Sequence, residues 1–152
     1  MDLAVSVHLE WVKRIFERIV RWKNWPDIGL LILRVGFGLG MAWHGWKKIG
    51  GDMGSFTERV DELGFPLAFI WAWAAALGEL FGGLLMAAGW WTRQASAVIA
   101  SIMVVAAFWV HAGDPFKRKE LALAYLVVSV CLVLTGPGRY ALEGLSVRFR
   151  RT

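Results

Sequence analysis

Six polar residues, set in a mostly apolar sequence, could do chemistry in this chain. They are Arg34, His44, Glu79, His111, Glu120 and Tyr125. Carboxylates and imidazoles can take up and deliver protons near neutral pH, and a guanidinium can hold a carboxylate or an anionic ligand. Tyrosine adds a hydroxyl that both donates and accepts hydrogen bonds. Which of these roles is open depends on which residues the fold brings together.

Arg34 and Glu79 are isolated charges in long apolar stretches. Glu79 is the only formally charged residue in 67–92. Arg34 is the only one in 28–46. Because a lone charge near the bilayer centre costs about 3 kcal/mol on insertion scales, each should face protein or a wet cavity. Counting helical rise from the nearest tryptophans puts both at one depth. We therefore predict that they pair, as a structural ion pair or as a catalytic, proton-handling or ligand-binding site.

His44, His111 and Glu120 are expected at one end of three different helices, with Tyr125 just over one turn away from Glu120. Two histidines and a carboxylate could bind a metal, ligate a haem or hydrogen-bond the carbonyls of a quinone. No HxxxH or HxxE spacing links them, so we assign no metal ligands and favour a quinone over haem or metal. The alternative is that they are hydrogen-bonded packing residues.

Hydropathy indicates the elements that must position these residues. The 152 residues are 57% hydrophobic with a mean hydropathy of +0.51, above the roughly 45–50% apolar content of soluble domains. Four nearly uncharged windows are each near the roughly 20 residues that cross a bilayer as a helix. They are 28–46, 67–92, 94–113 and 121–138. The sequence therefore predicts an all-α integral membrane four-helix bundle at 25–143, with no separate soluble domain.

Two basic segments flank the predicted bundle. Residues 1–24 alternate apolar and basic positions at near-helical spacing, which predicts an amphipathic helix on the membrane surface or, alternatively, one packed on a partner subunit. Residues 144–152 form a basic tail, either on anionic headgroups or solvated. These surfaces account for the basic charge without a nucleic-acid partner. Cys131 is the only cysteine, so an internal disulfide and a CxxC site are both excluded.

Charge and tryptophan positions predict an orientation. Ten Lys or Arg residues fall on the side of the termini and six on the other side, leaving out Arg34, so the positive-inside rule places both termini in the cytoplasm. Tryptophans gather near both ends of the windows, as interfacial belts do. Glycines at 36 and 40 form a GxxxG pair, and Gly38 and Gly45 lie on the Arg34 face. Such small residues predict close helix packing.

Several stretches of the chain are distinctive. They are LRVGFGLGMAWHGWKKI (33–49), LGFP (63–66), GELFGGLLMAAGWWTR (78–93), His111, the E-x-A-x-A-Y stretch at 120–125 and GPGRYALE (136–143). Together they resemble the DoxX-like family of small four-helix membrane proteins. The resemblance covers nearly everything from Leu33 to Glu143 and excludes the N-terminal extension.

The resemblance implies a bundle in a bacterial-type inner membrane that is one component of a larger assembly. One branch of the family supplies a subunit of a thiosulfate:quinone oxidoreductase, and others associate with thiol and oxidative-stress systems. The implied function is a redox-linked, quinone-associated subunit without its own redox centre. The residues that match the polar pattern of the family are Arg34, His44, Glu79, His111 and Glu120.

Two other functions are compatible with the sequence. A non-catalytic scaffold would use the glycine seams, the tryptophans and the basic helix to dock against other membrane subunits. A small-solute transporter would need more than four spans, which a homo-oligomer could supply. Lipid and other membrane proteins are the partners expected under every one of these functions.

Overall fold

The computed structural model describes residues 25–144, which contain helices and no β-strand. The elements are α2 (Trp25–Gly50), α3 (Met53–Glu62), α4 (Ala68–Ala88), α5 (Thr92–Val105), the π-helical η1 (Ala106–Val110) and α6 (Phe116–Thr135). The predicted all-α class is confirmed. The predicted surface helix at 1–24 and nearly all of the basic tail at 144–152 lie outside the described residues.

The long helices form a membrane bundle. By length and composition, α2, α4 and the continuous helix 92–110 can each cross a bilayer. The fourth predicted span, α6, has 20 residues but begins with the charged run Lys117 to Glu120, which shortens its apolar part. The structure therefore has four long helices as predicted, and three of them meet the apolar length that a bilayer requires.

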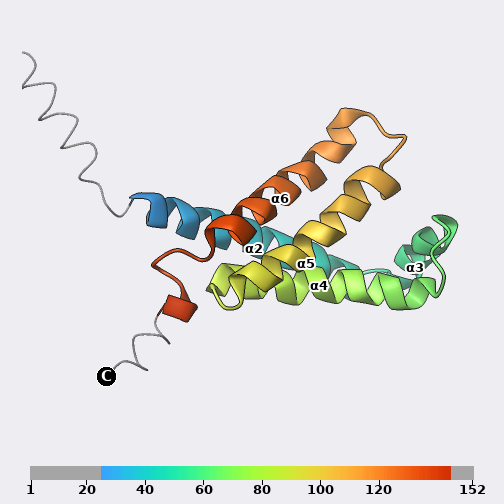
Figure 1. Ribbon diagram of the computed structural model, residues 1–152. Coiled ribbons are helices and arrows are strands. Elements are labelled where there is room, and N and C mark those ends of the chain that lie inside the picture. Colours follow the sequence, from blue (N-terminus) through green and yellow to red (C-terminus); the bar gives the residue numbers. More distant parts are fainter. Residues whose placement is uncertain (1–24, 145–152) are drawn as a thin grey trace, which may run out of the picture.

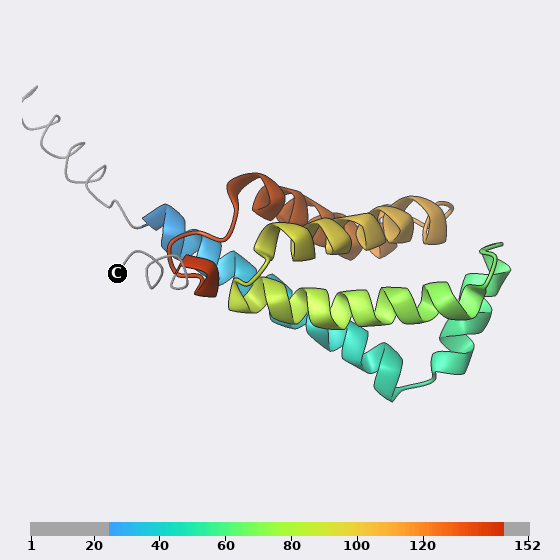
Figure 2. The same cartoon turned by 60° about the horizontal axis from the view of Figure 1, so that its bottom comes forward.

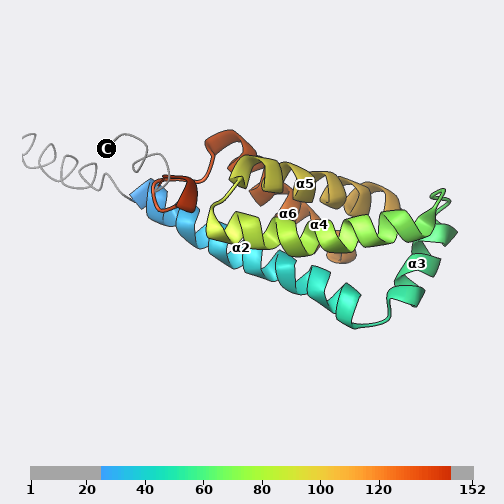
Figure 3. The ribbon, with the colours of Figure 1, turned by 90° about the horizontal axis from the view of Figure 1, so that it is seen from below.

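The helices pair in two layers (Figures 2 and 3). One layer consists of α2 and α4, and the other of α5 and α6, which cross the first layer obliquely (Figure 1). Helix α2 packs mainly on α4, while α6 packs mainly on α5. Buried apolar side chains fill the space between the layers, among them Met41, Met86, Ile99, Met103 and Leu132. This core holds the two layers together because its closely packed side chains make van der Waals contacts across them.

Glycines set the approach of α2 to α4. A methyl group added at Gly38 would lie 2.7 Å from the backbone nitrogen of Ala87, and one at Gly45 would lie 2.6 Å from the carbonyl oxygen of Ala76. The GxxxG pair does not serve this interface, since Gly36 faces open space and Gly40 faces the Tyr125 hydroxyl. Small residues therefore do pack the helices closely, but the contact uses Gly38 and Gly45, on the α2 face that also carries Arg34.

The predicted common depth of Arg34 and Glu79 is wrong. The Arg34 head group lies beside Gly89, at the very end of α4. Glu79 lies ten residues earlier on the same helix, about 15 Å away along its axis. Depth counted from tryptophans fails because α2 extends well past the end of α4 (Figure 1). Trp25 is the first residue of α2 and Trp90 follows the end of α4, so the two are not level.

Two local features were not predicted. Helix α3 is preceded by Asp52, whose carboxylate accepts hydrogen bonds from the Ser55 backbone N–H at 3.1 Å and from the Ser55 hydroxyl. This is a side-chain N-cap, and the Ser55 donors lower the pKa of Asp52. At the end of α5, the His111 N–H bonds to the Ala106 carbonyl at 3.0 Å, five residues back, so the last turn is a π-turn.

Candidate functional site

A cavity of about 170 Å³ lies between α2, α4, α5–η1 and α6, toward the end of the bundle that carries α3. Its polar lining consists of His44, Lys48, Glu79, His111, Arg118 and Tyr125. The rest of the wall is apolar, from methionine, leucine and alanine side chains. A mostly apolar hollow with a few convergent polar groups is the usual form of a small-ligand site.

The cavity brings together four of the six residues selected from the sequence. His44, Glu79, His111 and Tyr125 line it, whereas Arg34 and Glu120 do not. Glu120 is exposed on the first turns of α6. The cavity is therefore the place where the predicted chemistry can occur, and its members come from all four long helices.

Glu79 is buried and ion-paired with Lys48. Lys48 Nζ lies 2.5 Å from Glu79 Oε1, and the side chain of Glu79 is 3% exposed against 28% for Lys48. The second carboxylate oxygen, Oε2, is buried without a hydrogen-bond partner. The lysine also lies over the Phe56 ring at 4.6 Å, which fixes the ammonium between α3 and the cavity. A buried acceptor thus remains available on the cavity wall.

Tyr125 joins the two layers at the cavity. Its ring meets Phe37 edge to face at 5.3 Å and His44 at 6.0 Å between ring centroids. Its hydroxyl lies over Gly40, where a methyl group would collide with it. The absence of a side chain at position 40 therefore lets the phenol reach α2, which places a hydroxyl that can donate or accept beside His44.

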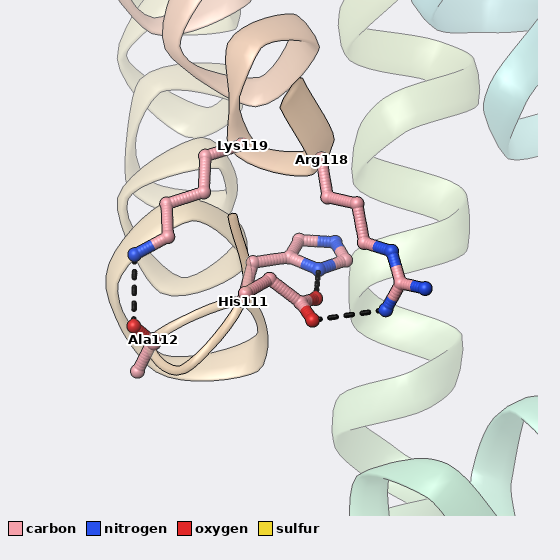
Figure 4. A network of polar contacts seen from close by, with 5 residues as sticks. His111, Ala112, Arg118 and Lys119 are labelled. Carbon is pink, nitrogen blue, oxygen red and sulfur yellow. Dashed lines mark hydrogen bonds and ion pairs between the residues drawn. The ribbon is translucent and has the colours of Figure 1, made fainter. Parts of the chain in front are cut away.

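A polar network surrounds His111 at the cavity mouth (Figure 4). His111 Nδ1 lies 2.8 Å from Asp114 Oδ2, and Arg118 Nη1 donates to Asp114 Oδ1 at 3.0 Å. Lys119 Nζ donates to the Ala112 carbonyl at 2.8 Å, which links the start of α6 to the connection between η1 and α6. The hydrogen bond with His111, aided by Arg118, lowers the pKa of Asp114. Asp114 is thus a carboxylate at neutral pH and accepts both bonds.

Arg34 does not pair with Glu79, so that prediction is wrong. Its guanidinium donates to the carbonyls of Pro137 and Tyr140, each at 2.6 Å, and the side chain is 1% exposed. Glu143 lies in the same corner and accepts from the Thr92 N–H at 2.7 Å. Arg34 therefore ties the segment 136–143 to α2, while Glu143 ties the same segment to the α4–α5 turn. The physical reason is reach, since those carbonyls are adjacent while Glu79 lies about 15 Å away.

Sequence reasoning missed three residues of this site. Lys48 follows His44 by four residues, and Arg118 precedes Tyr125 by seven, so helical spacing puts each on the face of a selected residue. That periodicity is a signal that could have identified both. Asp114 lies in the connection after η1, where no periodicity applies, and its role follows only from the turn geometry.

A wider hollow of about 590 Å³ lies between α3 and the start of α4. Its wall includes Thr57, Glu58 and Asp61, and no charged residue on it is buried. It is a surface hollow between two elements. Among residues 25–144, no group of three His, Cys, Asp or Glu side chains is arranged to hold a metal ion.

Comparisons with known proteins give one family and several relatives. The sequence profile of the DoxX family matches residues 29–112. "Inner membrane protein YqjF" of Escherichia coli (strain K12) is 29% identical over 129 residues, which cover 81% of this chain and 95% of that protein. "Putative oxidoreductase CatD" of Bacillus subtilis (strain 168) is 33% identical over 118 residues, 77% of this chain and 86% of that protein. No solved structure matches.

Proposed function

The chain belongs to the DoxX family, and we propose that it is a redox-linked membrane subunit whose cavity binds the ring of a lipid-soluble quinone. The relative named as a putative oxidoreductase supports redox work. The relative named as an inner membrane protein supports a bacterial inner membrane as the location. Both termini face the cytoplasm in this proposal, as the distribution of Lys and Arg favours.

The observation that carries the proposal is the buried Oε2 of Glu79, which has no hydrogen-bond partner and belongs to a residue on the cavity wall. Leaving such an atom unpaired costs about 1–3 kcal/mol, and a polar ligand would offset that loss. His44, His111 and Tyr125 line the same cavity and offer further hydrogen-bonding groups. A ring with more than one carbonyl or hydroxyl oxygen could use several of these groups at once.

Size and surroundings favour a single ring. An apolar cavity of roughly 150 Å³ accepts benzene, and this cavity of about 170 Å³ adds polar groups to a similar volume. The apolar wall from Met41, Met103 and Leu121 suits ring faces and methyl substituents.

Glu79 is the residue that we expect to contact the ligand and exchange protons with it, with His44, His111 and Tyr125 as additional binding groups. Arg34 is assigned a structural role instead. Electrons come from a partner subunit, because no cofactor-binding motif accompanies these residues in the sequence. A scaffold role loses one of its supports, since Gly38, Gly45 and Gly83 are used within this chain and are not free to bind another protein.

The test is purification of the full chain in mild detergent, followed by lipid extraction and absorbance spectroscopy. We expect about one quinone per chain in the wild type and a several-fold loss in Glu79→Gln. Glu58→Gln, an exposed acid on α3, is the matched control and should retain the quinone. A chain without quinone that co-purifies with a large complex would support the scaffold role, and a haem band would point to a different ligand.

A further inference from the structure

We propose that the cavity binds the reduced, hydroxyl-bearing form of its ring ligand more tightly than the oxidised, carbonyl-bearing form. This inference rests on the proposed function and adds the redox state of the ligand. A hydroquinone presents two O–H donors, whereas a quinone presents only carbonyl acceptors. The two forms therefore need opposite partners on the cavity wall, where two atoms, one of Glu79 and one of His111, are acceptors.

The first acceptor is Glu79 Oε2. Among the described side chains, several atoms are buried and unpartnered, but only this one belongs to a residue that lines the cavity. The Lys48 ammonium lies 2.5 Å from the other oxygen, Oε1, so its counter-charge is on that side of the carboxylate and Oε2 is left as an acceptor. A ligand hydroxyl would satisfy Oε2, whereas a ligand carbonyl would meet it as a second acceptor.

The second acceptor is the Nε2 atom of His111. Since the pKa of Asp114 is lowered, its carboxylate can only accept, so the proton of the 2.8 Å contact resides on His111 Nδ1. In a neutral imidazole, Nε2 then carries a lone pair. Figure 4 shows the imidazole of His111 extending toward α4, the helix that carries Glu79. Asp114 is thus a positioning residue that acts through His111.

Each charged donor on the same wall already has an acidic partner. Lys48 pairs with Glu79, and Arg118 pairs with Asp114 at 3.0 Å, so both cations are directed toward carboxylates of this chain. The Tyr125 hydroxyl and the His44 imidazole can each donate or accept, so they discriminate little between the two ligand forms. The preference therefore rests on Glu79 Oε2 and His111 Nε2, which are matched to the hydroxyl groups of a dihydroxy ring. If the reduced form binds tenfold more tightly, the two-electron potential of the bound couple rises by about 30 mV.

The test is binding of tetramethyl-1,4-hydroquinone and tetramethyl-1,4-benzoquinone to the full chain in lipid nanodiscs. The fully methylated ring resists addition by Lys48 or Cys131. Calorimetry under anaerobic conditions measures both affinities, and empty nanodiscs of the same lipid correct for partitioning. We expect the hydroquinone to bind at least tenfold more tightly. Equal or tighter binding of the quinone overturns the inference and leaves the proposed function standing. If neither form binds, the inference and the proposed function are both wrong.

Variants separate the two acceptors. Glu79→Gln replaces a carboxylate oxygen by an NH₂ donor, so the preference for hydroquinone should fall below threefold or reverse. Asp114→Asn should lower hydroquinone affinity about fivefold, while Glu58→Gln should change neither affinity. Circular dichroism and gel filtration check folding, and Asp114→Asn carries the test if Glu79→Gln does not fold. An unchanged preference in both folded variants would refute the assignment.

The tautomer of His111 gives a readout that needs no ligand. In ¹⁵N-histidine-labelled protein, with His111→Gln to assign the signals, we expect Nδ1 protonated and Nε2 unprotonated. Asp114→Asn should mix the two tautomers, and Asp114→Glu should restore part of the bias. A wild-type His111 protonated on Nε2 alone would overturn the second acceptor.

Discussion

Lys48 and Glu79 meet across the interface of α2 and α4, with 2.5 Å between Nζ and Oε1, so the buried acid takes its counter-charge from the far end of α2. The lysine belongs to the last turn of its helix, and its long stem carries the ammonium inward while 28% of the side chain stays exposed. Glu79 therefore has a counter-charge inside the bundle without any contribution from Arg34.

Replacing Lys48 by Met should destabilise the bundle by about 3 kcal/mol, because it leaves a buried carboxylate without its cation. The double variant Lys48→Met, Glu79→Met should recover most of that loss. Unfolding by SDS titration in mixed micelles measures the free energy. Lys47→Met is the matched control, because Lys47 does not line the cavity and its Nζ lies 5.5 Å from the centroid of the Trp43 ring. Its stability should stay within about 0.5 kcal/mol of the wild type. A destabilisation shared equally by all three variants would contradict the pair.

Adding a methyl group at Gly38 should push α2 away from α4. Because the nearest atoms, at 2.7 Å, belong to the backbone of Ala87 and Gly83, the side chains cannot absorb the clash. We expect Gly38→Ala to cost about 1–3 kcal/mol in the same SDS titration. Gly36→Ala is the control, since nothing lies within 4 Å of the added methyl, and it should be neutral or stabilising by up to about 1 kcal/mol. Equal effects would mean that the interface is not close-packed at Gly38.

Replacing Arg34 by Lys should release the segment 136–143 without affecting the cavity. An ammonium cannot span the carbonyls of both Pro137 and Tyr140, so we expect a loss of about 2 kcal/mol. Hydrogen exchange measured by mass spectrometry should rise in that segment and stay unchanged around Glu79. Arg93→Lys, where an exposed side chain makes one bond to the Val133 carbonyl, should have a smaller effect. Loss of ligand binding in Arg34→Lys with an intact fold would return Arg34 to the functional site.

The N-cap of α3 should respond to acid. The pKa of Asp52 is lowered because the Ser55 hydroxyl and N–H donate to its carboxylate. Its contribution to α3 is therefore fully present above the ordinary aspartate pKa of about 3.9, and is lost as pH falls through the lowered value in the folded protein. Carboxyl ¹³C NMR should record a midpoint below the ordinary value, and Ser55→Ala should raise it. A midpoint at the ordinary value would show that the cap is not formed.

Periodicity and hydropathy were sufficient to predict the class of the fold and most of the cavity. The apolar windows fix the long helices, and an acid such as Glu79 in one of them must face inward because lipid cannot solvate it. The residues His44, His111 and Tyr125 follow from the same reasoning, since each lies near the same end of its helix. Hydropathy and position along a helix can both be read from the order of residues in the chain.

The pairing of charges could not be predicted in the same way. Depth along α2 and α4 was measured from tryptophans, but the true register is set by where glycines allow backbone contact, at Gly38 and Gly45. That register carries Arg34 to the carbonyls of 136–143 and leaves Glu79 to Lys48. The bonds of Arg34 are to backbone carbonyls more than 100 residues away in the chain, and side-chain types carry no record of them.

The π-turn before His111 has a rotational consequence. Its bond from the His111 N–H to the Ala106 carbonyl spans one residue more than an α-helical bond would, so everything after it is turned by about 100° relative to an uninterrupted α-helix. Were this turn to tighten into α-helical winding, the imidazole would swing around the axis and leave the cavity, while Glu79 kept its place. The winding of a single helical turn thus decides whether the two acceptor residues, Glu79 and His111, line the same cavity.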